Sequence, residues 1–124
     1  MTNRIFLTVL AIMFIAFGFW SITDPVGMTT QLGVEVGGDA GVFEMRGVFG
    51  GISLGGAILC LLGAFKDRFT FAALCFVTTY MGGYAIGRAA SLIAGDSAPS
   101  SSWIFAGLEF VAFVFAAILT ARKA

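Results

Sequence analysis

The chain has 124 residues, of which 59% are hydrophobic and 11% are charged, and its mean hydropathy is +0.99. Soluble domains carry about 25% charged residues, so this composition predicts an integral membrane protein. Seven basic and seven acidic side chains cancel, which gives no reason to expect a nucleic-acid partner.

Four apolar stretches are long enough to cross a bilayer as helices, because a hydrocarbon core about 30 Å thick needs about 20 helical residues. The first stretch is residues 5–22, which ends before Asp24-Pro25, where proline opposes continuation of a helix. We expect the other three at about residues 43–65, 69–94 and 103–121. The regular alternation typical of transmembrane strands is missing. The sequence therefore predicts an all-α protein, with a single transmembrane domain over residues 1–124 built as a four-helix bundle.

The basic residues outside these spans would all lie on one side of the membrane if the four helices alternate in direction: Arg4, Lys66, Arg68, Arg122 and Lys123. The loops 23–42 and 95–102 carry acidic residues but no Lys or Arg. By the positive-inside rule, both termini are expected in the cytoplasm. The first span has no small-x-small cleavage site, so we expect it to stay attached.

The outer loop, residues 23–42, is the longest segment outside the predicted spans. Residues 26–34 within it are apolar enough to form a short helix on the outer surface, where it could cap polar groups beneath it. A solvated connector is the alternative interpretation.

Four ionisable residues lie inside the predicted spans, namely Glu44, Arg46, Arg88 and Glu109. Arg88 and Glu109 are each six residues from the outer boundary, a depth of about 9 Å, so we expect them to pair. A lone charge at the bilayer centre costs about 2.5 to 3.5 kcal/mol, which favours convergence of all four inside the bundle. Such a cluster could be a ligand or proton site, or an ion-pair latch that fixes helix register, and the sequence leaves both open.

Two rows of glycines recur at a spacing of four residues, which places each row on one face of a helix. The rows are Gly47, Gly51 and Gly55 on the second span, and Gly83 and Gly87 on the third. Small residues at this spacing let membrane helices approach closely. We therefore expect the tightest helix contacts at these rows, directly beside Arg46 and Arg88.

Few other side chains offer chemistry. Tyr84 and Tyr80 lie one and two turns from Arg88 and could donate hydroxyl hydrogens to a carboxylate or a ligand, although tyrosine is also an ordinary bundle residue. Cys60 and Cys75 have matching depths on neighbouring spans but no CxxC motif, and the sequence does not decide whether they are close. The absence of histidine removes the main residue of haem, zinc and Ser/His or Cys/His sites. We therefore expect no cofactor, no metal and no catalytic residues.

The charged and glycine positions also form a pattern. Glu44-x-Arg46-Gly47-x-x-Gly50-Gly51, followed by Gly87-Arg88, Gly95-Asp96-x-x-Pro99 and Glu109, resembles the small bacterial four-helix membrane proteins grouped as DUF4345. The chain is more broadly similar to DoxX-like proteins. The resemblance implies a multi-pass protein of the bacterial inner membrane, and it adds Asp96 to the characteristic charged set. Ser97 stands where a glycine is expected, and the family implies no activity.

These features support three functional hypotheses. The first is a binding or carrier protein whose outer site, built on Arg46 and Arg88, receives a small anionic or amphipathic ligand such as a lipid headgroup or a quinone. The second is an accessory or scaffold subunit of a larger membrane complex, or a homo-oligomer, in which the charges only lock the bundle. The third hypothesis is an enzyme, since glutamate, arginine and tyrosine can act as acids and bases. It ranks last because no nucleophile or cofactor site can be identified.

Overall fold

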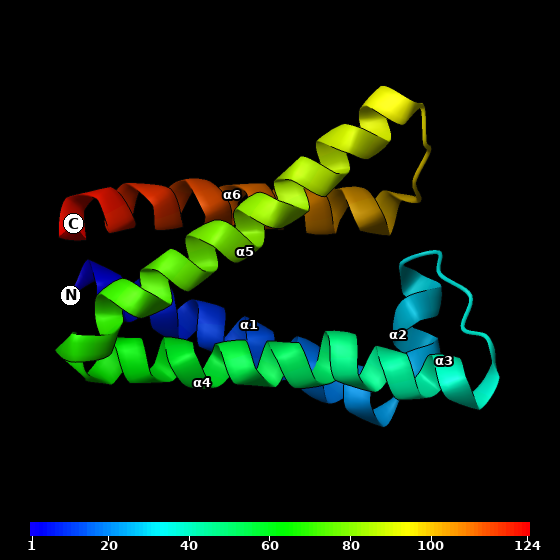
Figure 1. The fold of residues 1–124 in the computed structure, drawn as a ribbon, viewed down its shortest axis with the longest axis horizontal. Helices are drawn as coiled ribbons and strands as arrows, with labels where there is room; N and C mark the ends of the chain where they lie inside the picture. The colour runs from blue at the N-terminus through cyan, green and yellow to red at the C-terminus, as the bar shows by residue number, and fades with distance from the viewer.

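The computed structural model describes residues 1–124, and all of its regular elements are helical (Figure 1). The first, third and fourth crossings are α1 (Thr2–Thr23), α5 (Asp67–Ala94) and α6 (Ser100–Lys123). The second crossing consists of α3 (Gly38–Met45), a π-helical turn η1 (Arg46–Gly51) and α4 (Ile52–Phe65). All four segments are long and apolar enough to cross a membrane, which confirms the predicted all-α membrane architecture. They extend beyond the apolar stretches because polar residues continue the helices at their ends.

The outer loop contains a short helix, α2 (Pro25–Gln31). Asp24 caps it, since its carboxylate accepts a hydrogen bond of 3.0 Å from the backbone N–H of Gly27, and Pro25 occupies the first turn. Met28 and Thr29 are fully buried, so α2 packs against the bundle and does not merely rest on its surface. Ser101 at the start of α6 donates a hydrogen bond to the carbonyl oxygen of Gln31, which ties α2 to α6.

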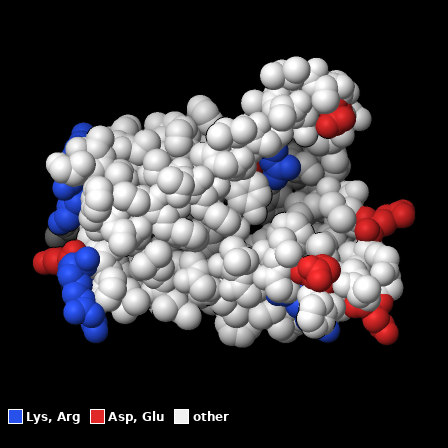
Figure 2. All heavy atoms as spheres, in the orientation of Figure 1, with Lys and Arg blue, Asp and Glu red and all other residues white.

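Figure 1 shows α4 and α6 running in similar directions on opposite sides of the view, with α1 inclined to them and α5 crossing obliquely. α5 begins close to α4, moves away from it along its length and packs against α6 where the two helices cross. Both termini lie at the same end of the molecule. We call the half of the molecule at this end the terminal half, and the half that contains α2 and α3 the loop half. Lys and Arg gather at the terminal end and Asp and Glu at the loop end (Figure 2).

The hydrophobic core occupies the terminal half and the middle of the bundle. Its fourteen buried residues come from α1, α4, α5 and α6: Leu7, Leu10, Ala11, Phe14, Ala57, Cys60, Ala64, Ala73, Leu74, Val77, Met81, Ala112, Ala116 and Leu119. Small side chains predominate on α4, where Gly56 and Gly63 join Ala57, Cys60 and Ala64 on the buried face. This face lets α4 pack closely between α1 and α5.

Gly63 marks one of the closest approaches between helices. A Cβ added at this position would lie 2.5 Å from the Cβ of Ala73 and 3.1 Å from Leu7. The Thr70 hydroxyl donates a hydrogen bond of 2.7 Å to the carbonyl oxygen of Gly63, which further joins α4 to α5. Only glycine fits this position without displacing its neighbours.

The glycine rows predicted to mediate the helix contacts do not do so, and that prediction was wrong. A Cβ at Gly47, Gly55, Gly83 or Gly87 would have no neighbouring atom within 4 Å, and one at Gly51 would meet only the carbonyl oxygen of Arg46, at 3.9 Å. A four-residue spacing identifies a face of a helix but not what covers it. The wide turn η1 also adds a residue and so changes which face of the second crossing points at α1. The tight contacts are made by other glycines, namely Gly18, Gly50, Gly56, Gly63 and Gly82.

Candidate functional site

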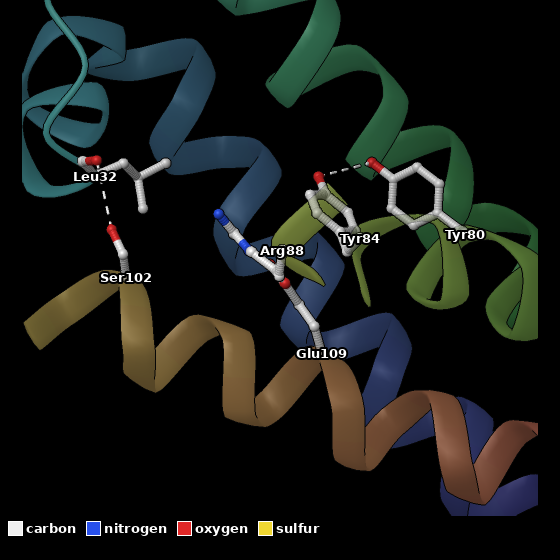
Figure 3. Close-up of polar contacts among 6 residues, drawn as sticks. All are labelled: Leu32, Tyr80, Tyr84, Arg88, Ser102 and Glu109. Atoms are coloured by element: carbon white, nitrogen blue, oxygen red, sulfur yellow. Dashed lines mark hydrogen bonds and ion pairs between the residues drawn. The ribbon is translucent and has the colours of Figure 1, made fainter. Parts of the chain in front are cut away.

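Arg88 and Glu109 form the single salt bridge of the chain (Figure 3). Arg88 Nη2 donates to Glu109 Oε1 at 3.0 Å, and Arg88 Nε donates to Oε2 at 3.2 Å. Both carboxylate oxygens are therefore engaged by one guanidinium, the strong two-bond geometry of arginine–carboxylate pairs. The two side chains are 42% and 14% exposed.

The connection between α5 and α6 brings these two charges to the same level. Gly95 ends α5 with a φ of +85°, a left-handed conformation that favours glycine, and Pro99 immediately precedes α6. The two helices run antiparallel with only a short loop between them, so residues at similar distances from the loop face each other. Arg88 and Glu109 satisfy this condition, as their matched depth in the sequence predicts.

Two tyrosines, Tyr84 and Tyr80, lie on the same face of α5 as Arg88. The Arg88 Cζ atom lies 5.8 Å from the centroid of the Tyr84 ring, and the Tyr84 and Tyr80 hydroxyl oxygens are 3.4 Å apart (Figure 3). Tyr80 in turn contacts the rings of Phe76 and Phe14, with centroids at 5.2 and 6.0 Å. The spacing of four residues places the three side chains on one stripe of α5.

An apolar cavity of about 340 Å³ lies on one side of this stripe, among α1, α4, α5 and α6. Twelve of its fourteen lining residues are hydrophobic, and its aromatic walls include Phe14, Phe17 and Phe105. Ser53 and Glu109 are the two polar residues of the wall, and Tyr80 and Tyr84 also line it. The cavity thus combines an apolar body with a polar edge, which is the usual composition of a small-molecule site.

A polar groove of about 520 Å³ lies along α5 and is lined by Thr79, Tyr80, Gly83, Tyr84, Gly87, Arg88 and Ser91. Figure 2 shows the surface hollowed in the loop half, where α5 moves away from α4. The groove and the cavity share Tyr80 and Tyr84, while Arg88 lines the groove and Glu109 lines the cavity. The ion pair therefore stands between the two hollows.

The other predicted charges do not join this pair. Glu44 and Asp96 are exposed and form no salt bridge. Arg46 is also exposed, and its Nε donates a hydrogen bond of 3.0 Å to the carbonyl oxygen of Ile22. The expected convergence of four charges was wrong because α5 and α6 diverge from the second crossing in the loop half, which leaves Glu44 and Arg46 beside the end of α1.

Arg46 has a counterpart at the opposite end of the molecule. Arg4 Nε donates a hydrogen bond of 3.1 Å to the carbonyl oxygen of Ala64, near the end of α4. The last four carbonyls of a helix have no partner within it, so each arginine supplies a donor that the neighbouring helix lacks. α1 and the second crossing thus cap each other's ends. The role of Arg46 in the sequence motif is explained by this contact.

The residues that form most of the cavity wall could not be identified from the sequence. Phe14, Phe17 and Phe105 are apolar, and an apolar residue that faces a cavity has the same chemistry as one that faces lipid.

Cys60 is buried and Cys75 is half-buried, and both are free thiols.

The fold and the site together define a small four-helix membrane protein with one ion pair between an apolar cavity and a polar groove. The chain belongs to the DUF4345 family, a domain of unknown function, whose family model matches residues 2–120. The predicted resemblance is confirmed over nearly the whole chain. Comparisons with curated proteins and with solved structures give no match. The function must therefore be argued from the site itself.

Proposed function

We propose that this protein binds one small neutral amphiphile, either lipid-derived or quinone-like. Its apolar part would occupy the cavity and its polar end would meet Glu109, Tyr84 and Arg88. The observation that carries the proposal is the cavity of about 340 Å³ with an ion pair and a tyrosine hydroxyl at its edge. Small-molecule sites span about 300 to 1,000 Å³, so this volume suits one ring system or one short chain.

The neutrality of the ion pair supports an uncharged ligand. Each oxygen of Glu109 already accepts a hydrogen bond from Arg88, so the pair has no net charge left to balance a charged ligand. Arg88 uses two of its N–H groups in these bonds, and three of its five donors remain for a carbonyl, ester or hydroxyl oxygen. Of the anionic and amphipathic ligands expected for a site on Arg46 and Arg88, we therefore propose the amphipathic one. Arg46 is left out of the proposed site because its Nε is bonded to the carbonyl oxygen of Ile22 and it does not line the cavity.

Native mass spectrometry from a mild detergent tests this proposal. The native protein should carry one small molecule, which extraction then identifies. Glu109→Gln keeps the shape of the side chain but leaves Arg88 uncompensated, so it should reduce occupancy by a neutral molecule. Thr79→Val is the matched control, because Thr79 lines the groove and not the cavity. The proposal fails if no molecule is bound, or if the molecule that the native protein carries is anionic.

A second candidate function, an accessory subunit of a larger membrane complex or a homo-oligomer, is favoured by the outward-facing glycine rows. Nothing in the chain covers Gly47, Gly55, Gly83 or Gly87, and such rows commonly receive another helix. The same mass spectrum distinguishes this function, because a stoichiometric protein partner would accompany the chain in place of a small molecule.

The proposed setting is the bacterial inner membrane, with both termini in the cytoplasm. The basic side chains at the terminal end and the acidic ones at the loop end support this orientation (Figure 2). The ligand site would then lie in the outer half of the bilayer.

A further inference from the structure

The exposed part of the cavity wall belongs to two helices only. Met13, Ala16 and Trp20 on α1 and Leu108 on α6 both line the cavity and are exposed at the protein surface. The lining residues of α4 and α5 are buried or half-buried. In addition, α1 packs along α4 and α6 packs along α5, with little direct contact between α1 and α6. The cavity therefore opens between α1 and α6.

Two aromatic pairs bridge α1 and α6 on either side of this opening. Phe6 and Phe115 stack with ring centroids 6.3 Å apart, and Phe17 and Phe105 meet edge to face, also at 6.3 Å. Phe6 and Phe17 are eleven residues apart on α1, so the pairs are separated by about 16 Å. We call the part of the opening that lies between the two pairs, beside Met13, Ala16 and Leu108, the slot.

The slot lies at the depth of the lipid chains. The residues of α1 between Phe6 and Phe17 belong to the middle of a helix that is long enough to cross the membrane. Toward the loop end, Ser101 and Ser102 of α6 bond to the backbone at the end of α2, which holds α2 against the start of α6. The opening consequently faces hydrocarbon and not water.

We propose that the ligand enters the cavity sideways from the bilayer through the slot, and that Phe17 and Phe105 form its movable edge. This inference rests on the proposed binding function and narrows the ligand to an amphiphile already dissolved in the membrane. Phe17 also packs edge to face on Phe49 of η1, with ring centroids 6.0 Å apart, so Phe105 is the less restrained of the two rings. A rotamer change of Phe105 would widen the slot without moving either helix. A polar metabolite confined to water would have no route to this opening.

The route can be tested by kinetics, because a gate changes entry and exit alike whereas a binding contact changes affinity. In a Trp103→Phe background, Trp20 is the sole tryptophan and lines the cavity. The probe is a short-chain benzoquinone, added to the protein in phosphatidylcholine vesicles, and the saturable part of the Trp20 fluorescence quenching reports binding. Because Phe105 also lines the cavity, Phe105→Leu should raise the dissociation rate through the lost contact, and a faster association rate is the signature of the gate. We expect the association rate to rise by about tenfold.

Phe110→Leu is the matched control, since Phe110 is an exposed phenylalanine of α6 that does not line the cavity. Its rates should equal those of the parent. Equal rates in Phe105→Leu and the parent, or a change in dissociation alone, would overturn the slot while leaving the binding site intact. A parent protein without saturable quenching would instead overturn the proposed function, and the slot with it.

Discussion

The terminal half and the loop half contain the same four crossings but differ in the side chains that lie between them. In the terminal half, small residues such as Gly63 and Ala73 allow α4, α1 and α5 to pack without gaps. In the loop half, only Ser102 is buried among residues 82–110 of α5, the connecting loop and α6. The comparison shows that glycine alone does not close a membrane interface, because Gly83 and Gly87 lie in the open half.

The polar groups of the two halves differ in the same way. In the terminal half, Thr70 bonds to the backbone of Gly63, and Thr78 and Thr120 bond to each other across α5 and α6 at 2.9 Å. In the loop half, Arg88 keeps unused donors beside two hollows. We therefore expect the stability of the fold to depend mainly on the terminal half, while the proposed ligand site extends from the middle of the bundle toward the loop half.

The largest expected effect comes from breaking the ion pair. Glu109→Ala leaves Arg88 uncompensated within the membrane, and breaking a buried pair costs about 3 to 5 kcal/mol. Since Arg88 is 42% exposed, the loss should fall below the upper end of this range. Arg88→Ala should also destabilise the protein, and the double variant should recover part of the loss in a thermal-stability cycle in detergent. Strict additivity of the two single effects would mean that the residues do not interact.

The next largest effect on stability is expected from filling the packed face of α4, compared with its open face. Gly63→Leu places a side chain where a Cβ would already meet Ala73, and overpacking of this kind costs about 1 to 3 kcal/mol. Gly55→Leu, two turns earlier in α4, points to open space and should leave unfolding in detergent nearly unchanged. If the two variants lose the same stability, close packing is not confined to the face of α4 that contacts α1 and α5.

A smaller effect is expected at the reciprocal caps. Arg46→Gln removes the charged donor to Ile22, and Arg4→Gln removes the corresponding donor to Ala64. Both variants should lower the Tm by less than Gly63→Leu does, because each loses one partly solvated hydrogen bond. Arg46→Gln should keep the occupancy of the cavity measured by native mass spectrometry. Loss of the bound molecule in Arg46→Gln but not in Arg4→Gln would show that Arg46 takes part in ligand binding.

The smallest perturbation tests which side of the membrane each half faces. A reporter that is active only in the periplasm, fused after Ala124, should give no signal and should not alter stability, while the same reporter inserted beside Ser97 should be active. The reverse pattern would place the loop half, with its cavity, on the cytoplasmic side.

The fold class and the Arg88–Glu109 pair could be predicted from the sequence because both depend on distances along helices. The length of the apolar stretches gives the crossings, and the short loop before α6 gives the two charges a common level. The positions of Glu44, Arg46 and the glycine rows depend instead on helix rotation and on η1, which one sequence does not reveal. The cavity was equally hidden, because Phe17 and Phe105 have the same apolar character as residues that face lipid.

We propose that the loop half stays open because a ligand occupies the cavity. An experimental structure of the native protein in nanodiscs formed directly from its own membrane tests this most directly. We expect non-protein density between Leu10, Tyr84 and Leu108, with a polar end within hydrogen-bonding distance of Arg88 or Tyr84. A structure in which α5 packs against α4 along its whole length and the cavity is filled by protein side chains would contradict it.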